Sequence, residues 1–528
     1  MNAGSTTVDS MLPTTIGSVL SNVTRQGAVV LVSRGASFLL AIASTILLSR
    51  LLGTAGLGQF RLGSVVVQLL TIFCLLGLDG GLLRYLPVLE TRGGNGSRTL
   101  LARSSRVVIA ISLALSVALL LGAPALATYY FHSPGMTNVL RVFSLQVPVL
   151  VLFRFLSGAV TAAKRVDFAS RITNILSPAI FLVLVALIGF VHHGLYGPIA
   201  ARILAQLAAV LCLVSFLMRR YPKVPKIEPV ADNTFREYLG LSMPLFFIGM
   251  GYQLLNQMDT IMLGHFASER DVGVYSVAVK VSSFVLVGLG IMLPIVSPLF
   301  SQFSETRDKE LTKALFTTVT KWLCYSGLII FACIAIFRVE LLHLFGKGFT
   351  AGATALLILA VGHLVNAATG PTGILLTMTG KQKWEVANTI SMVAFNFLLN
   401  LVLIPTMGLI GAAIATAVSI ATINILKLVQ VYMLFGLRAY NLKCLKGVFA
   451  IGGAGLIGYL VRSWLSNVGY SPFTIIPLGG TAFLITATLG FLLLGLDHED
   501  KMAIIALRRR QSDVSALPGG KTPEQRSY

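Results

Sequence analysis

Long runs of apolar residues dominate the chain, and short polar segments separate them. Each run has roughly 20 residues, the length at which an α-helix crosses the hydrocarbon core of a bilayer. The runs are continuous and do not alternate between apolar and polar positions, which disfavours the strands of a membrane barrel. We therefore predict an all-α polytopic membrane protein with fourteen spans. They lie near residues 27–48, 62–83, 107–128, 139–160, 172–192, 196–217, 241–263, 273–299, 318–338, 351–377, 386–404, 408–433, 447–465 and 474–495.

The composition agrees with this pattern. Of 528 residues, 55% are hydrophobic and only 12% are charged, whereas soluble domains have about 25% charged residues. A net charge of +21 would point to nucleic acid in a soluble protein, but Lys and Arg concentrate in the cytoplasmic loops of membrane proteins. We therefore expect no nucleic-acid partner. The sequence has no Gly-rich phosphate loop and no metal-spaced cluster of His, Cys and carboxylate residues, so we expect no cofactor and no catalytic residue.

The basic residues indicate how the spans are oriented. Fourteen is an even number, so both ends of the chain lie on one side of the membrane. If that side is the cytoplasm, the inner loops and tails hold 29 Lys and Arg residues, the outer loops hold seven, and five lie inside spans. This distribution predicts that both termini are cytoplasmic. All outer loops are short, so we expect the functional groups within or between the helices.

One corner of the chain occurs twice. The stretch TILLSRLLGTAGLGQF (45–60) resembles TIMLGHFASERDVGVY (260–275), with Gly58 aligned to Gly273 at an offset of 215 residues. A second pair of stretches has an offset of 214 residues: HGLYGPIAARILA (193–205) and MGLIGAAIATAVS (407–419). Spans one to six therefore recur as spans seven to twelve. Six is even, so the halves cross the membrane in the same direction, and an axis along the membrane normal relates such parallel repeats.

This repeat defines the domains that we predict. A first lobe covers residues 1–236 and a second covers 237–440, while helices thirteen and fourteen occupy 441–497 and a basic cytoplasmic tail occupies 498–528. Transporters built from repeats bind their substrate where the repeats meet. We therefore expect a central cavity between the two lobes.

Five motifs resemble oligosaccharide flippases of the multidrug, oligosaccharidyl-lipid and polysaccharide exporter superfamily. They are LLSRLLGTAGLGQF (47–60), GLDGGLLRYLP (77–87), MDTIMLGHFASERDVGVYSVA (258–278), LLHLFGKGFTAGATALLILA (341–360) and LIPTMGLIGAAIATAVS (403–419). The resemblance covers residues 20–435 and fits six plus six plus two spans. It implies a V-shaped pair of helix bundles that moves a polyprenyl-linked sugar by alternating access. It also implies a cavity walled by helices one, two, seven and eight.

Polar side chains at helical spacing mark these four walls. Residues at i, i+3 or i+4 and i+7 share one face of a helix. The stripes include Arg34 on span one, Gln68 on span two, Tyr252, Asn256 and Asp259 on span seven, and Lys280 on span eight. We predict that these residues bind substrate. Packing between helices through small and hydroxyl residues is the alternative explanation for a single stripe.

Charged residues inside the spans are mainly basic. They are Arg34, Arg154, Arg202, Lys280 and Lys427, against Asp79 and Asp259. A charge at the bilayer centre costs about 3 kcal/mol or more, so it usually faces protein or a water-filled cavity. A positive cavity suits a pyrophosphate, and we predict that Arg154 and Arg202 also bind the substrate. Snorkelling to the headgroups is the alternative for Arg34 and Lys280, and a fixed structural role is the alternative for Arg154 and Arg202.

The acidic residues have two predicted roles. Asp79 and Arg84 lie about a turn and a half apart near the inner end of span two, where they form a gate or an ordinary capping pair. Asp259 is the one acid well within a span of the second half, and it pairs with a basic residue across the cavity or binds a coupling cation.

The sequence therefore favours a transporter and not an enzyme. By its resemblance to the flippases, it would use alternating access to flip a polyprenyl-diphosphate-linked oligosaccharide from the inner to the outer leaflet of a bacterial plasma membrane, for cell-surface or exopolysaccharide biosynthesis. Its partners would be that lipid, the membrane lipids, and a polysaccharide polymerase or other biosynthesis proteins. Two alternatives stay open. A drug or cation antiporter of the same superfamily would have an acid in span one, where this chain has Arg34. A membrane polymerase or ligase for the same lipids would have sizeable outer loops.

Two substituted cysteines test the predicted topology. In a background without the five natural cysteines, a membrane-impermeant thiol reagent added to intact cells should label Ser471→Cys and spare Ser512→Cys. The reason is that residue 471 lies in an outer loop of our topology and residue 512 lies in the cytoplasmic tail. Labelling at position 512 without labelling at position 471 would show that the orientation is inverted.

Overall fold

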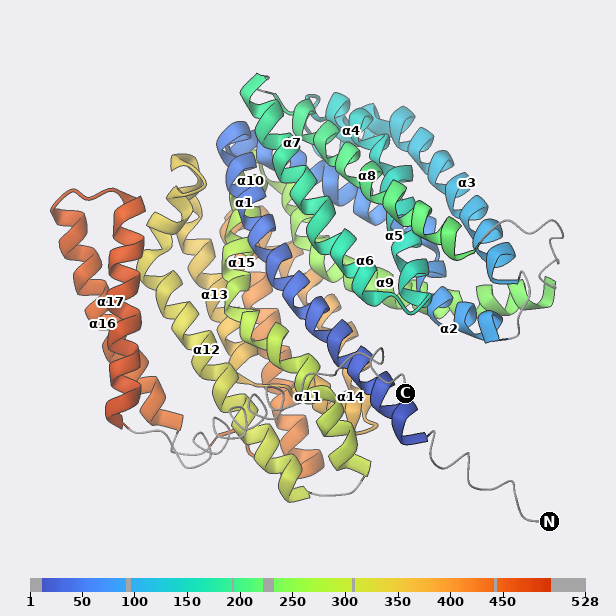
Figure 1. Cartoon of the computed structure of the whole chain (residues 1–528). Coiled ribbons are helices and arrows are strands. Elements are labelled where there is room, and N and C mark those ends of the chain that lie inside the picture. Colours follow the sequence, from blue (N-terminus) through green and yellow to red (C-terminus); the bar gives the residue numbers. More distant parts are fainter. Residues whose placement is uncertain are drawn as a thin grey trace, which may run out of the picture. The chain divides into compact units, whose positions relative to one another are not determined.

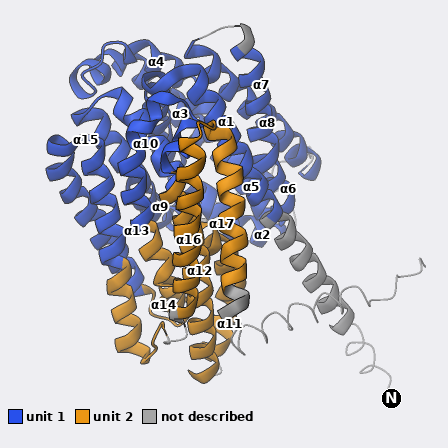
Figure 2. Cartoon of the chain, turned by 90° about the vertical axis from the view of Figure 1, so that its left-hand side faces the viewer, with its two compact units in different colours: residues 1–284, 338–362, 383–423 blue, residues 285–337, 363–382, 424–528 orange. Residues whose placement is uncertain are grey.

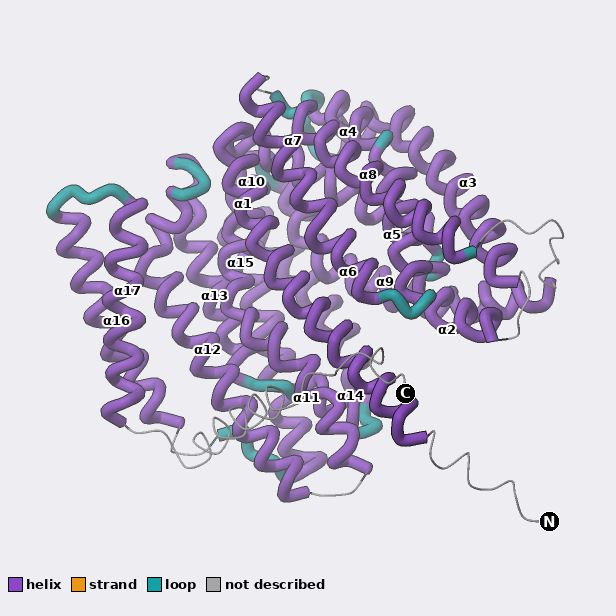
Figure 3. The backbone as a smooth tube through the Cα atoms, in the orientation of Figure 1, coloured by secondary structure: helices purple, strands orange, loops and turns teal. Residues whose placement is uncertain are grey.

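The computed structural model describes residues 12–91, 96–191, 194–221, 232–305, 309–440 and 444–494. The predicted tail, 498–528, lies outside them. Within this part of the chain every regular element is a helix (Figure 3). The elements are α1 (Leu12–Leu75), α2 (Leu78–Thr91), α3 (Gly96–Ala125), η1 (Leu126–Tyr130), α4 (Met136–Ser144), α5 (Gln146–Ala162), α6 (Val166–Arg171), η2 (Ile172–Leu176), α7 (Ser177–Val191), α8 (Tyr196–Arg220), α9 (Asp232–Phe266), α10 (Glu269–Ser282), η3 (Ser283–Leu286), α11 (Val287–Glu305), α12 (Lys309–His343), η4 (Lys347–Gly352), α13 (Ala353–Ala368), α14 (Thr372–Met378), α15 (Gln382–Phe435), α16 (Cys444–Asn467) and α17 (Pro472–Leu494).

Among the described residues, 11 helices are long and apolar enough to cross a membrane, or 12 if the bent pair α4 and α5 is one span. Two of these candidates, with 44 and 54 residues, are about twice as long as a bilayer requires. Each contains one glycine with non-helical backbone angles, Gly53 in α1 and Gly408 in α15. The predicted helical membrane fold is confirmed. The count of fourteen stays a prediction. It would be met if α4 and α5 form one span and if α1 and α15 each form two.

The second predicted span, 62–83, is wrong as one continuous helix. The helix ends at Leu75, and α2 begins at Leu78, because Leu76 and Gly77 have φ angles of 48° and 72°. This left-handed conformation favours glycine. A Cβ atom on Gly77 would also lie only 2.2 Å from the carbonyl oxygen of Ser242, so α9 approaches the break closely.

Contacts divide the chain into two compact units (Figure 2). Unit 1 contains residues 1–284, 338–362 and 383–423, and unit 2 contains residues 285–337, 363–382 and 424–528. In unit 2, α16 packs against α17 around a core that includes Ile451 and Phe483. These units differ from the two predicted lobes, since unit 1 includes helices from both halves of the repeat. The predicted boundaries at residues 236, 440 and 497 stay predictions.

Unit 1 brings the two repeated corners together. Helix α10 lies beside α1 (Figure 1). The start of α10 is fixed by Ser268, whose hydroxyl accepts a hydrogen bond from the backbone N–H of Asp271 at 3.1 Å in a capping box. This cap ends the turn that follows α9 and sets the direction in which α10 runs along α1.

Gly58 and Gly273, the aligned glycines of the two corners, meet directly. A Cβ atom on Gly58 would lie 1.8 Å from the carbonyl oxygen of Glu269, and one on Gly273 would lie 1.9 Å from that of Thr54. Thr54 and Glu269 are themselves separated by the 215-residue offset of the repeat. The contact is therefore reciprocal, as expected for two copies related by a two-fold axis.

Alanine at either glycine should disrupt this contact. Alanine favours a helix by about 1 kcal/mol over glycine, but overpacking of this kind costs about 1–3 kcal/mol or more. We therefore expect Gly58→Ala and Gly273→Ala to lower the melting temperature of the purified protein. Gly249→Ala is the matched control, because Gly249 lies in α9 with no atom within 4 Å of its ideal Cβ position. A melting temperature that rises equally in all three variants would contradict the close contact.

Candidate functional site

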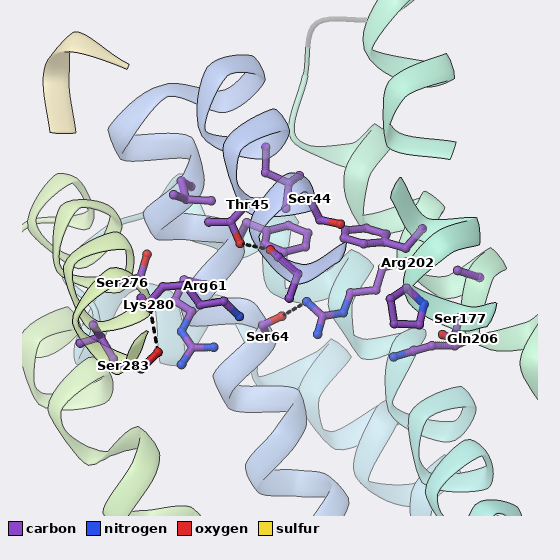
Figure 4. A pocket seen from close by; sticks show the side chains of 18 residues that line it. Ser44, Thr45, Arg61, Ser64, Ser177, Arg202, Gln206, Ser276, Lys280 and Ser283 are labelled. Carbon is purple, nitrogen blue, oxygen red and sulfur yellow. Dashed lines mark hydrogen bonds between the residues drawn. The ribbon is translucent and has the colours of Figure 1, made fainter. Parts of the chain in front are cut away.

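A cavity of about 410 Å³ lies within unit 1 between α1, α7, α8 and α10 (Figure 4). This volume is in the range of pockets that enclose a small molecule. The lining residues are Ala41, Ser44, Thr45, Leu48, Leu57, Phe60, Arg61, Ser64, Ser177, Pro178, Phe181, Arg202, Ala205, Gln206, Ser276, Val279, Lys280 and Ser283. Three of these side chains are basic, and none of the described lining side chains is acidic.

The three cations come from three helices and face the same space. Arg61 lies on α1, Arg202 on α8 and Lys280 on α10. Their charges act on one another, since Arg61 repels Arg202 and both repel Lys280. An anion in the cavity would relieve this repulsion. Charge-assisted hydrogen bonds to an anion are also the stronger kind, so the arrangement is suited to a ligand with more than one negative charge.

Arg202 is held in place on three sides. It donates a hydrogen bond to the hydroxyl of Ser64 at 2.9 Å. Its guanidinium carbon lies 5.6 Å from the ring centroid of Phe60 and 5.9 Å from that of Phe181. Both distances are within the range of cation–π attraction. The sequence analysis gave Arg202 two possible roles, a fixed structural role and substrate binding. These contacts are compatible with both.

Arg61 joins the cavity to α9 through a group of glutamines. Its Nη2 donates to Oε1 of Gln257 at 2.8 Å. The amide nitrogens of Gln257 and Gln253 both donate to Oε1 of Gln68, at 3.4 and 3.3 Å. We call Gln68, Gln253 and Gln257 the glutamine ladder. A guanidinium has five N–H donors, and the bond to Gln257 uses one of them, which leaves donors that can turn to a ligand.

The predicted site residues fall into two groups. The structure brings Arg202 and Lys280 into the cavity lining and places Gln68 directly behind it, in the glutamine ladder. Arg34 is exposed and does not line the cavity. It lies seven residues before Ala41 on the same face of α1, about 10 Å further along the helix axis. Its role in binding stays a prediction.

The remaining basic and polar predictions lie away from the cavity lining. Arg154 interacts electrostatically with Asp79 and with Arg202. Tyr252 and Asn256 are exposed on α9, where the Asn256 side chain donates to the Tyr252 carbonyl at 2.7 Å. Neither side chain bonds to the glutamine ladder, whose members Gln253 and Gln257 reach Gln68 on α1.

In the predicted gate, Asp79 is near a different basic residue from the one that the sequence indicated, Arg84. The charge that acts on Asp79 is that of Arg154 on α5. Arg84 is exposed on α2. An Asp79–Arg84 gate stays a prediction, and in this conformation α5 supplies the basic neighbour of Asp79.

Asp259 lies in a separate polar cluster within unit 1. Its carboxylate accepts hydrogen bonds from Asn400 Nδ2 at 2.6 Å, from Thr416 Oγ1 at 2.5 Å and from the Tyr275 hydroxyl at 3.0 Å. All three donors are neutral, so no basic residue of the described chain pairs with this carboxylate. In this conformation Asp259 is therefore not paired with a described basic residue, and its binding of a coupling cation or of substrate stays a prediction.

Arg61 is the basic cavity residue that the sequence analysis missed; the neutral lining residues Ser177 and Gln206 were missed as well. Arg61 was counted with the outer loops because the second span was predicted to begin at residue 62. The helix after Gly53 in fact includes Arg61, which lines the cavity. The spacing held the necessary signal, since Arg61, Ser64 and Gln68 follow the i, i+3, i+7 pattern of one helix face.

Family models match most of this architecture. Residues 23–304 match the model described as polysaccharide biosynthesis protein, and residues 244–405 match the MatE model. The chain belongs to the polysaccharide biosynthesis protein family. The predicted membership of the exporter superfamily is thereby confirmed, and this superfamily consists of transporters.

Three archaeal proteins are similar to this family member in sequence. An uncharacterised membrane protein of Methanocaldococcus jannaschii is 26% identical over 66% of the chain and 72% of its own length. The probable flippase AglR of Haloferax volcanii is 27% identical over 52% of the chain and 57% of its own length. The probable low-salt glycan biosynthesis flippase Agl15 of the same organism is 26% identical over 34% of the chain and 38% of its own length.

Two solved structures share the fold. The lipid II flippase MurJ, in an inward closed conformation, superposes with a TM-score of 0.67 at 14% identity over 88% of this chain and 98% of that one. An inward-facing multidrug resistance transporter of the MATE family superposes with a TM-score of 0.64 at 17% identity over 76% of this chain and 94% of that one.

Changing Gln257 should alter anion binding through Arg61. Gln257→Glu puts a carboxylate against the guanidinium, and we expect it to weaken the binding of inorganic pyrophosphate at least tenfold, as a lost charge-assisted hydrogen bond does. Gln257→Met keeps the charge of Arg61 and should weaken binding less. Isothermal titration calorimetry with the purified protein measures both effects.

Gln253→Glu is the control, because it adds the same charge to α9 one turn from Gln257, at a residue that bonds to Gln68 and not to Arg61. We expect a smaller loss of affinity than with Gln257→Glu. Equal affinities in Gln257→Glu and Gln253→Glu would mean that Gln257 does not control the charge of Arg61.

Proposed function

We propose that this protein flips a polyprenyl-diphosphate-linked oligosaccharide from the inner to the outer leaflet of the plasma membrane. The observation that carries this proposal is a cavity with Arg61, Arg202 and Lys280 and no acid among its described lining residues. Two of the similar archaeal proteins are named probable flippases, and the name of one of them refers to glycan biosynthesis, which supports the flipping of a lipid-linked glycan.

The cations are proposed to bind the diphosphate. A diphosphate presents several anionic oxygens, and three basic side chains from different helices can each donate to one of them. Each charge-assisted hydrogen bond contributes about 1.5–3 kcal/mol. Arg61 and Arg202 belong to the first half of the repeat and Lys280 to the second, so a bound diphosphate would connect the two halves during alternating access.

Arg34 is proposed to receive the diphosphate before the cavity does. It lies on the face of α1 that leads to Ala41 and the cavity, and by our topology it is nearer the cytoplasm. The proposed direction of movement is then from Arg34 to the three cavity cations. Cytoplasmic termini, a bacterial source and cooperation with a polysaccharide polymerase remain parts of the proposal that rest on the sequence.

The main alternative, a drug or cation antiporter, requires acids where a cationic drug binds. The cavity in unit 1 has cations there, and Asp259 lies in its own cluster outside the lining. The second alternative, a polymerase or ligase, loses support because the chain belongs to a superfamily of transporters.

Flipping in proteoliposomes tests the proposal. With a fluorescent polyprenyl-diphosphate sugar, Arg61→Gln and Lys280→Gln should each slow transport about tenfold or more, since each removes a charge-assisted hydrogen bond. Arg61→Lys should keep part of the activity, because it retains the charge and loses the fork of two donors.

Arg141→Gln is the matched control for these variants. Arg141 is exposed on α4, and among the described residues its side chain bonds only to Asn138, so it should be replaceable without loss of transport. The proposal fails if the Arg61→Gln, Lys280→Gln double variant flips the lipid at the wild-type rate. Wild-type flipping by Arg34→Gln alone would remove only the receiving role of Arg34.

A further inference from the structure

The cavity has a second end with different chemistry. Figure 4 shows Lys280 and Arg61 on one side and Ser177 and Gln206 on the other, with Arg202 between them. The polar side chains at the second end are neutral. A diphosphate does not need these groups, so the second end requires another explanation.

Gln206 is held so that one group faces the cavity. Its Oε1 accepts a hydrogen bond from Nε2 of Gln146 at 3.0 Å, and the two side chains are only 6% and 1% exposed. The Gln206 NH2 group donates to no group of the described chain, and Gln206 lines the cavity. A buried NH2 group without an acceptor costs free energy. The Gln206 NH2 group would gain an acceptor from a ligand in the cavity.

The side-chain oxygen Oε1 of Gln146 is buried and has no hydrogen-bond partner in the described chain. Its lost hydration adds to the free-energy cost of burying the two amides. A buried amide pair with one unsatisfied oxygen contributes little net stability. The arrangement is better explained as a support that fixes the direction of the Gln206 side chain.

The neighbours of Gln206 complete a surface for a polyhydroxyl group. Ser177 supplies a hydroxyl, and Phe181 supplies an apolar ring from the same helix, α7. Gln206 follows Arg202 by four residues on α8, so their side chains are neighbours about 5–6 Å apart on one face. A group attached directly to a phosphate at Arg202 would therefore reach Gln206.

We propose that this neutral end binds the sugar that is joined directly to the diphosphate, with Gln206 donating a hydrogen bond to a hydroxyl or amide oxygen of that sugar. This inference rests on the proposed function. It assigns the basic end to the diphosphate and makes Gln206 a determinant of sugar specificity, with Gln146 as its positioning residue.

Two soluble ligands separate the two ends of the cavity. One is citronellyl diphosphate, and the other is the same compound carrying a single N-acetylglucosamine. With the purified full chain in nanodiscs, titration calorimetry should show that the sugar-bearing compound binds more tightly. Gln206→Leu should reduce this preference about three- to tenfold, the effect of one neutral hydrogen bond, and should leave the affinity for citronellyl diphosphate unchanged.

Lys280→Gln is the reciprocal variant, because it should weaken both ligands equally and keep the preference. Ser177→Ala is a smaller change at the neutral end and should also reduce the preference. It replaces Gln206→Leu in the test if that variant does not fold.

A wild-type protein that binds citronellyl diphosphate with no gain from the sugar overturns this inference and leaves the proposed function intact. Equal weakening of both ligands by Gln206→Leu also overturns it. Failure of citronellyl diphosphate to bind the wild-type protein counts against the proposed function itself.

Discussion

The reciprocal contact of Gly58 and Gly273 is the constraint on which the arrangement of unit 1 depends. Each glycine lies against a carbonyl oxygen of the other corner, and neither position has room for a Cβ atom. Arg61 follows Gly58 by three residues, and Lys280 follows Gly273 by seven. The close approach of the two helices therefore also brings their basic side chains to one cavity.

Gathering three half-buried cations at one cavity has an electrostatic cost, because each is partly desolvated and is repelled by the others. The protein offsets part of this cost through Ser64, through the rings beside Arg202 and through Gln257. These contacts use few of the available N–H donors. The site is thus prepared for an anion and is not neutralised by the protein itself.

The sequence was sufficient to predict the helical membrane fold and to select Arg202 and Lys280, which line the cavity, because hydropathy and charge inside an apolar run are local signals. It was insufficient where tertiary contact decides the outcome. The break at Gly77 lies where α9 approaches closely, and Arg61 lies in the helix that follows the break at Gly53. The exposure of Tyr252 could not be predicted, because a stripe on α9 does not reveal which face meets α1.

The repeat also explains why the cavity and the Asp259 cluster are chemically opposite. At the two offsets of the repeat, Ser44 aligns with Asp259, and Arg202 aligns with Thr416. Ser44 and Arg202 line the basic cavity, whereas Asp259 and Thr416 bond to each other in the acidic cluster. In each aligned pair, one half has a charged side chain where the other has a hydroxyl: Arg202 faces Thr416 in the alignment, and Asp259 faces Ser44. The two halves therefore share a backbone arrangement, and side-chain differences at equivalent positions give a basic cavity in one place and a carboxylate with neutral partners in the other.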